Sequence, residues 1–187
     1  TERMFKSLKL PIRLKKFHDY DLIELSKPNK IKNLNFNIPG DISSAAFFIV
    51  LTILSSKSSI VLRNININPS RTGIIKILNK MGAKIKLKNI KIINGEKCSD
   101  IHVKSIKNLR SINCPPSLNS SAIDEFLIIF LVAAKAKGMS YFKNLSELNQ
   151  KESPRLKWGK YILDQMGIKT IIKKDSIKIY GNPNLEI

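Results

Sequence analysis

The sequence predicts a mixed α/β (α+β) fold built from one helix-and-sheet unit that occurs twice. The order of polar turns, apolar runs and alternating stretches in residues 38–92 recurs in residues 114–179. In both copies the hydrophobic period changes from helical to strand-like at corresponding places. With 187 residues, of which 43% are hydrophobic, the chain can bury a sizeable core. A repeat this long is a unit of a compact fold and not a solenoid repeat.

Each copy begins with a polar turn followed by an apolar helix. The first reads PGDISS and then AAFFIVLTIL, and the second reads PPSLNSSAID and then EFLIIFLVAAKAKG. Both helices are apolar nearly all round, so we expect them to be buried on all sides. A short strand follows each helix and ends in a basic residue and asparagine, at Arg63-Asn64 and at Lys143-Asn144.

A loop that contains an arginine then leads into the second helix of each copy. In the second copy we expect Ser153 as the N-cap, Pro154 at the first helical position and Gly167 at the end. The apolar residues at helical spacing are Ile74, Ile75, Ile77, Leu78 and Met81 in the first copy, and Leu156, Trp158, Ile162, Leu163 and Met166 in the second. Strands close both copies; KIKLKNIKI alternates, which places its lysines on the solvent side.

The first residues repeat only the end of the unit, as a helix over 1–8 and strands over 11–17 and 21–25. Residues 26–37 are polar, contain a proline and read as a connection between domains. We therefore assign 1–37 to the tail of one domain and the crossover from it. Residues 38–187 form two units of another domain, about 38–112 and 113–187. Because the chain starts at a threonine inside a predicted helix, it reads as an internal piece of a longer protein.

The charge balance points to anionic ligands. Thirty-three lysines and arginines against fourteen acidic residues give a net charge of +19. This suits nucleic acid, anionic lipid or phosphorylated metabolites. Lysine, isoleucine and asparagine are abundant along the whole chain, as in proteins from AT-rich genomes, so we favour compositional bias over a nucleic-acid footprint. Aromatic residues make up 7% and do not interleave with basic residues as single-strand binding surfaces do.

Several other classes of site are not indicated. Cys98, Cys114, His18 and His102 are isolated in sequence, without the spacing of a disulfide framework, zinc site or catalytic pair, so we interpret them as structural. No glycine pattern matches a nucleotide-binding loop. The longest apolar runs are shorter than the roughly 18 residues of a membrane span, and no signal peptide is visible.

Asp124 is the first candidate for chemistry. The repeat places it opposite Ser44, at the start of an apolar helix, with Glu125 beside it. Ser121 and Asp124 have the spacing of a capping box, so the carboxylate has a purely structural interpretation, which the spacing alone favours. Alternatively, nearby cations hold it ionised and it acts as a base.

The stretch KESPR is the second candidate. It is either a solvated charge cluster beside an ordinary N-cap or an anion site. Free N–H groups at a helix start, together with Lys151 and Arg155, suit a phosphate or carboxylate. Glu152 is then the proton-transfer group inside that site. The corresponding loop of the first copy, NPSRTG, keeps Arg71 but has no acid, which suggests that the second loop is specialised.

At these residues the sequence resembles 5-enolpyruvylshikimate-3-phosphate (EPSP) synthases. Four stretches carry the resemblance in the right order: PGDISSAAFF, NPSRTGIIKILNKMGA, IDEFLIIFLVAAKAKG and LNQKESPRL. TERMF at the start resembles the segment before the family's domain crossover. The resemblance covers nearly the whole chain and implies an inside-out barrel of repeated helix-and-sheet units, here a fragment of a two-domain enzyme whose helix starts meet at the cleft.

The resemblance also implies an activity and site residues. The family transfers the carboxyvinyl group of phosphoenolpyruvate to the 5-hydroxyl of shikimate 3-phosphate, in the pathway to chorismate and the aromatic amino acids, without metal or organic cofactor. Asp124 matches the aspartate that binds the shikimate hydroxyls and accepts a proton. Lys151 matches a lysine that contacts shikimate 3-phosphate, Glu152 the proton donor and Arg155 an arginine that binds phosphoenolpyruvate. A cytoplasmic monomer that binds neither nucleic acid nor membrane is implied, and we expect the isolated chain to be inactive.

The sequence departs from the family pattern at Asn149, Gln150, Pro154 and Leu127. The family usually has Arg-Val at the first two, aspartate at the third and often proline at the last. The loss of an arginine at Asn149 removes a nearby cation. Two other functions stay open at this point: an enolpyruvyl transferase that acts on a UDP-sugar, and a basic nucleic-acid-binding or RNA-end-processing protein of similar fold.

Overall fold

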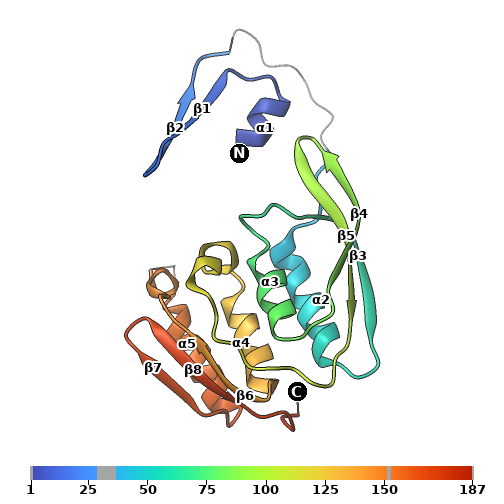
Figure 1. Ribbon diagram of the computed structural model, residues 1–187, viewed down its shortest axis with the longest axis vertical. Helices are drawn as coiled ribbons and strands as arrows, with labels where there is room; N and C mark the ends of the chain where they lie inside the picture. The colour runs from blue at the N-terminus through green and yellow to red at the C-terminus, as the bar shows by residue number, and fades with distance from the viewer. Residues whose placement is uncertain (1, 29–36, 151–152, 187) are drawn as a thin grey trace.

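A computed structural model describes residues 2–28, 37–150 and 153–186 of the chain (Figure 1). The N-terminal part consists of α1 (Glu2–Ser7) and an antiparallel hairpin of β1 (Ile12–Lys16) and β2 (Asp21–Leu25). Arg3 of α1 donates to Glu96 at 3.1 Å, which connects this part to the rest of the chain. The predicted helix and two strands are confirmed.

Two copies of one element order follow. The first copy contains α2 (Ile42–Leu54), β3 (Ser59–Asn66), α3 (Gly73–Lys80), β4 (Lys86–Ile93) and β5 (Glu96–Lys104). The second contains α4 (Phe126–Lys135), β6 (Gly138–Phe142), α5 (Arg155–Gln165), β7 (Thr170–Lys173) and β8 (Ser176–Gly181). The strand orders correspond, β3-β5-β4 and β6-β8-β7, and all pairs are antiparallel. The last strand of each copy is therefore central in its sheet.

The turns also correspond between the copies. Asn64 and Asn144 both have left-handed backbone, with φ of 58° and 59°. Asn64 lies within β3, where the pairing with β5 shifts between Leu62 and Ile65, whereas Asn144 follows β6. Asparagine tolerates the left-handed region better than most residues, which suits both positions. Gly82 and Gly167 follow the second helices with φ of 100° and 71°. The glycine predicted to end α5 is thereby confirmed.

The helices lie between the two sheets. In Figure 1, α2 to α5 run side by side with the sheet of β3, β4 and β5 on one side and that of β6, β7 and β8 on the other. The central helix α4 contacts α2, α3 and α5. One hydrophobic cluster joins both copies, and its largest fully buried side chains include Phe126, Phe130 and Phe142. This arrangement, with helices inside and sheets outside, agrees with the predicted inside-out barrel.

Three expectations about burial or boundaries need correction. The apolar helix α2 is not covered on all sides, because Phe47, Phe48 and Leu51 are more than half exposed. No described segment packs over this face. In α5, Trp158 and Ile162 are also exposed although they fit the helical pattern.

The start of α5 lies one residue later than expected. Its N-cap is Pro154 and no side chain caps the helix; the carbonyl of Ser153 instead accepts from the Arg155 N–H at 2.8 Å.

The central strand β5 was not predicted. Its sequence EKCSDIHVK mixes charged residues with a fully buried serine, Ser99, whose hydroxyl donates to the Lys88 carbonyl at 2.7 Å.

Candidate active site

Asp124 lies just before α4, after two short 3-10 turns, Pro116–Leu118 and Ser120–Ala122. The capping-box interpretation is wrong. The helix starts at Phe126, its N-cap is Glu125, and no side chain makes the capping hydrogen bond. The Ser121 hydroxyl donates to the Leu118 carbonyl at 3.0 Å. The Asp124 carboxylate is therefore available for a different role.

Each oxygen of the Asp124 carboxylate accepts from a different arginine. Arg71 Nη1 donates to Oδ2 at 2.8 Å, and Arg155 Nη1 donates to Oδ1 at 3.1 Å. Arg71 comes from the loop before α3, and Arg155 opens α5. These are corresponding loops of the two copies. The repeat thus brings two corresponding cations to one acid, and charge-assisted hydrogen bonds of this kind stabilise an ionised carboxylate.

A second acid lies behind this cluster. Glu125 is 3% exposed, and its Oε1 accepts from the Ser43 hydroxyl at 2.5 Å. Ser43 Oγ in turn accepts from Arg71 Nη2 at 3.0 Å. Burial raises the pKa of the Glu125 carboxyl, and the charges of Asp124 and Asp41 act in the same direction, while the Ser43 hydrogen bond and Arg71 oppose it. The chain of contacts joins Asp124, Arg71, Ser43 and Glu125 into one network.

The start of α2 adds a third carboxylate. Asp41 is the N-cap of α2 and accepts from the Ser44 backbone N–H at 3.0 Å and the Ser44 hydroxyl at 3.1 Å. Burial opposes ionisation of Asp41, but these hydrogen bonds and that of Ser43, with the Arg71 charge, lower its pKa. The starts of α2, α4 and α5 therefore meet around one set of charged groups.

The four residues predicted from sequence divide into two groups. Asp124 and Arg155 are brought into direct contact, as a site requires. Lys151 and Glu152 lie outside the described residues, so their roles stay predictions. Sequence reasoning did not assign roles to Arg71, Ser43 or Glu125. The signal for Arg71 was present, since the repeat sets the NPSRTG loop opposite the loop that carries Arg155.

Cys98 and Cys114 are free and buried, as expected of structural residues, and burial raises the pKa of the Cys114 thiol to about 11. Among the described residues no group of three or more histidine, cysteine or acidic side chains has the arrangement of a metal site. None of the described helices is long and apolar enough to cross a bilayer.

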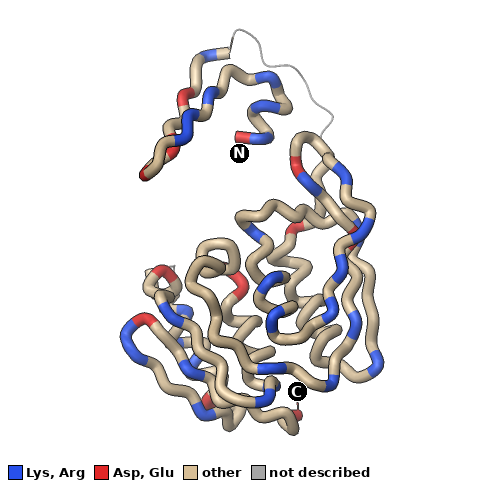
Figure 2. Tube along the Cα trace, viewed as in Figure 1, with Lys and Arg blue, Asp and Glu red and all other residues tan. Residues whose placement is uncertain are grey.

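The positive charge is spread over the chain. Figure 2 shows lysines and arginines on the N-terminal hairpin, on both sheets and on the helices. The acids are fewer, and those around Asp124 coincide with the meeting point of the helix starts. The site is thus defined by a local pairing of charges, which the overall charge of +19 would not reveal.

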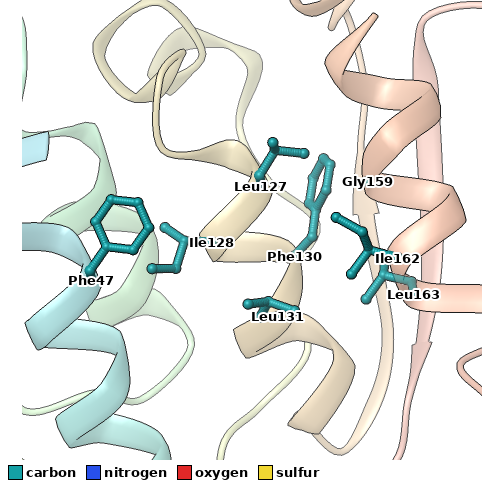
Figure 3. Close-up of a pocket in the computed structure, with 8 residues that line it drawn as sticks. All are labelled: Phe47, Leu127, Ile128, Phe130, Leu131, Gly159, Ile162 and Leu163. Carbon is teal, nitrogen blue, oxygen red and sulfur yellow. The ribbon is translucent and has the colours of Figure 1, made fainter. Parts of the chain in front are cut away.

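The described chain also has an apolar pocket of about 170 Å³ between α2, α4 and α5. Figure 3 shows Phe47 on one side and Ile162 and Leu163 on the other, with α4 side chains between them. At Gly159 a Cβ would lie 3.0 Å from side-chain atoms of Leu127 and Phe130, so α5 approaches α4 closely at this glycine. A lining without polar side chains suits packing of another apolar surface and not recognition of an anion.

The structure is a repeated helix-and-sheet barrel in which an acid, Asp124, is held between two arginines at the helix starts. The comparisons with known proteins agree with this class. Residues 1–186 match the family described as EPSP synthase (3-phosphoshikimate 1-carboxyvinyltransferase). The chain belongs to the EPSP synthase family.

Curated relatives carry the same name. The 3-phosphoshikimate 1-carboxyvinyltransferase of Legionella pneumophila (strain Corby) is 39% identical over 97% of this chain and 41% of its own length. That of Vesicomyosocius okutanii is 40% identical over 97% of this chain and 40% of its own length. The chain thus spans about two fifths of the curated relatives it matches.

Solved structures support the fold. An EPSP synthase from Acinetobacter baumannii superimposes with a TM-score of 0.88 at 37% identity, over 97% of this chain and 40% of that one. The enolpyruvyl transferase NikO from Streptomyces tendae has a TM-score of 0.60 at 12% identity, over 92% of this chain and 37% of that one. The second likeness concerns the fold alone.

Proposed function

We propose that this chain contributes part of the active site of a 3-phosphoshikimate 1-carboxyvinyltransferase. The observation that carries the proposal is the Asp124 carboxylate with one arginine on each oxygen, where the starts of α2, α4 and α5 meet. Family membership and the names of the relatives support the same activity. Both substrates, shikimate 3-phosphate and phosphoenolpyruvate, are multiply anionic, which suits a site supplied with cations.

In the proposed reaction, the 5-hydroxyl of shikimate 3-phosphate attacks C2 of phosphoenolpyruvate and C3 takes up a proton. The resulting tetrahedral intermediate loses phosphate and a proton from C3 to form the enol ether. Asp124 binds the shikimate hydroxyls and accepts the hydroxyl proton, a role open to an ionised carboxylate. Arg155 binds phosphoenolpyruvate, and a planar guanidinium matches a carboxylate or phosphate in bidentate fashion.

The remaining roles fall on residues whose placement is not described. We assign Glu152 as the proton donor to C3 and Lys151 as a contact to shikimate 3-phosphate. Both precede α5 in the sequence by a few residues, and the contact of Arg155 with Asp124 brings the start of that helix to the proposed site. In this proposal the protein acts as a monomer and needs no metal or organic cofactor.

A UDP-sugar acceptor is the alternative within the fold. The likeness to NikO, at 12% identity, supports a shared fold without favouring any acceptor. The curated relatives of the chain, at 39% and 40% identity, favour shikimate 3-phosphate. The proposal therefore prefers that acceptor.

The test is acceptor-dependent phosphate release from phosphoenolpyruvate by a chain of the relatives' length that contains this sequence. Shikimate 3-phosphate and UDP-N-acetylglucosamine are offered in parallel, with Glu152→Gln as the variant. We expect release only with shikimate 3-phosphate, reduced about 100-fold or more by the substitution. Release only with the UDP-sugar would overturn the choice of acceptor, and release with neither would overturn the activity.

A further inference from the structure

We propose that Arg71 is a positioning residue that holds Asp124 in place for the shikimate substrate while Arg155 engages phosphoenolpyruvate. This inference rests on the proposed function and adds a residue to it. In the structure, Arg71 and Arg155 contact different oxygens of Asp124. If Arg155 turns toward an anionic substrate, Arg71 still contacts the carboxylate.

The guanidinium of Arg71 is fixed at two points. Nη1 donates to Asp124 Oδ2 at 2.8 Å, and Nη2 donates to Ser43 Oγ at 3.0 Å. Ser43 itself donates to the buried Glu125 at 2.5 Å. Because the guanidinium is planar and its donors have fixed directions, two anchored nitrogens determine the orientation of the group. The carboxylate that it contacts is oriented with it.

The loop that carries Arg71 is held by its own hydrogen bonds. The Asn66 side chain accepts from the Asn68 N–H at 2.8 Å, and the Asn68 carbonyl accepts from the Arg71 N–H at 2.8 Å. The Asn68 side chain accepts from the N–H and hydroxyl of Ser70 at 3.2 and 3.1 Å. Such side-chain-to-backbone bonds define the turn. The backbone at Arg71 is therefore held by hydrogen bonds, as its guanidinium is.

The start of α3, two residues after Arg71, packs directly on the segment that leads to Asp124. A Cβ added to Gly73 would lie 2.5 Å from Ser121 Oγ, 2.7 Å from the Ser121 carbonyl carbon and 2.8 Å from the Ala122 Cβ. Only glycine allows this approach. Arg71 and Asp124 thus project from two segments in contact, which fixes the separation between them.

The surroundings of Arg71 favour a positioning role over direct substrate binding. Arg71 borders a hollow of about 350 Å³ that is also lined by Asp41 and Glu96. Two carboxylates in the lining of this hollow disfavour an anionic ligand there, and the Arg71 charge already stabilises ionised Asp41. The charge of Arg71 is thus directed at acids of the protein.

The experiment is a double-mutant cycle between Arg71→Met and Asp124→Asn in a chain of the relatives' length. Calorimetry measures the Kd for shikimate 3-phosphate, so the cycle does not depend on turnover. We expect Arg71→Met to weaken binding about tenfold in the unsubstituted background and less than about twofold beside Asp124→Asn, because its effect passes through that residue. In the kinetics, kcat should fall while the KM for phosphoenolpyruvate changes less than about threefold.

The control is Arg63→Met, which removes an exposed arginine of the same copy and should leave binding and kcat unchanged. The proposal would be overturned if Arg71→Met weakened shikimate 3-phosphate binding equally in the unsubstituted chain and beside Asp124→Asn. A KM for phosphoenolpyruvate raised about tenfold by Arg71→Met would also overturn it. If the Arg71→Met variant does not fold, Ser43→Ala takes its place in the cycle. A weakening of shikimate 3-phosphate binding by Ser43→Ala that persists beside Asp124→Asn would again overturn the proposal. If the unsubstituted enzyme neither binds nor converts shikimate 3-phosphate, the proposed function fails and not the positioning role alone.

Discussion

The Ser43 hydroxyl lies 2.5 Å from Oε1 of Glu125 and donates to it, which joins the first turn of α2 to the start of α4. The two helices are the corresponding first helices of the two copies. The contact therefore crosses the boundary between the copies at the point where Asp124 is presented. It makes the stability of the fold and the geometry of the candidate site depend on the same groups.

The ionisation of Glu125 should make stability depend on pH. Burial is the main cause that raises the pKa of the Glu125 carboxyl above the ordinary 4.5. The folded chain therefore binds the proton more tightly than the unfolded chain, so this contribution is fully present below pH 4.5 and is lost as pH rises through the folded value. Glu125→Gln cannot ionise. The melting temperature of the variant relative to the unsubstituted chain should rise from pH 4.5 to pH 7.5. A pH-independent difference would contradict this reasoning.

Gly73→Ala should destabilise the chain and disturb the site. The new Cβ would meet the backbone of Ser121 and the Cβ of Ala122 at under 3 Å, so the segment before Asp124 must move. We expect a loss of about 1–3 kcal/mol in the free energy of unfolding, measured by denaturant titration. Lys76→Ala, an exposed position on the same helix, is the control and should change stability by less than about 0.5 kcal/mol. If Gly73→Ala and Lys76→Ala changed the free energy of unfolding equally, the close contact at Gly73 would not be the cause of the loss.

The N-cap of α2 gives a prediction that separates capping from charge. Asp41→Ala removes the acceptor for two Ser44 donors and should cost about 1 kcal/mol. Asp41→Asn keeps a capping oxygen and should cost less. Although burial opposes it, hydrogen bonding lowers the Asp41 pKa below the ordinary 3.8, so the contribution of its charge is present above that pH and lost on acidification through the lowered value. Unfolding measured at pH 7 and below pH 3.8 would check both statements.

The exposed face of α2 should respond to whether further chain covers it. Leu51 is 64% exposed and Ile53 is fully buried on the same helix. In the isolated chain, Leu51→Ala should change stability by less than about 0.5 kcal/mol, whereas Ile53→Ala should cost about 2–5 kcal/mol.

In a chain of the relatives' length, a further segment packed on this face would raise the cost of Leu51→Ala to about 2–5 kcal/mol. The cost of Ile53→Ala should be similar in both lengths. If Leu51→Ala stays neutral in the longer chain, the face is not an internal packing surface.

The repeat could be predicted because residues close together in the sequence determine the features that recur. The glycines at 82 and 167 occupy left-handed positions after corresponding helices, and the asparagines at 64 and 144 occupy left-handed positions in or just after corresponding strands. Few residues tolerate this region, so their recurrence marks corresponding places in the two copies. The strand β5 was less visible, since its buried Ser99 is satisfied by a hydrogen bond to Lys88 on a neighbouring strand. That partner is known only once the sheet is formed.

The candidate site was predictable in part. The repeat and the KESPR pattern single out Asp124 and Arg155, and the family resemblance adds their expected roles. In the structure Arg155 Nη1 lies 3.1 Å from Asp124 Oδ1. The spacing of Ser121 and Asp124 alone suggested a helix cap, and this was wrong because 3-10 turns precede α4. Ser43 and Glu125 are 82 residues apart in sequence, and no local pattern relates them. Their contact depends on the packing of α2 against α4.

The central claim is that Asp124 acts in carboxyvinyl transfer, and Asp124→Asn tests it most directly. The substitution keeps the size of the side chain and removes its charge. The measurement is kcat for the release of phosphate from phosphoenolpyruvate, with shikimate 3-phosphate as the acceptor, by a chain of the relatives' length. We predict a fall of about 100-fold or more, with the melting temperature within a few degrees of the unsubstituted protein. A variant that folds and keeps kcat within about threefold would contradict the account.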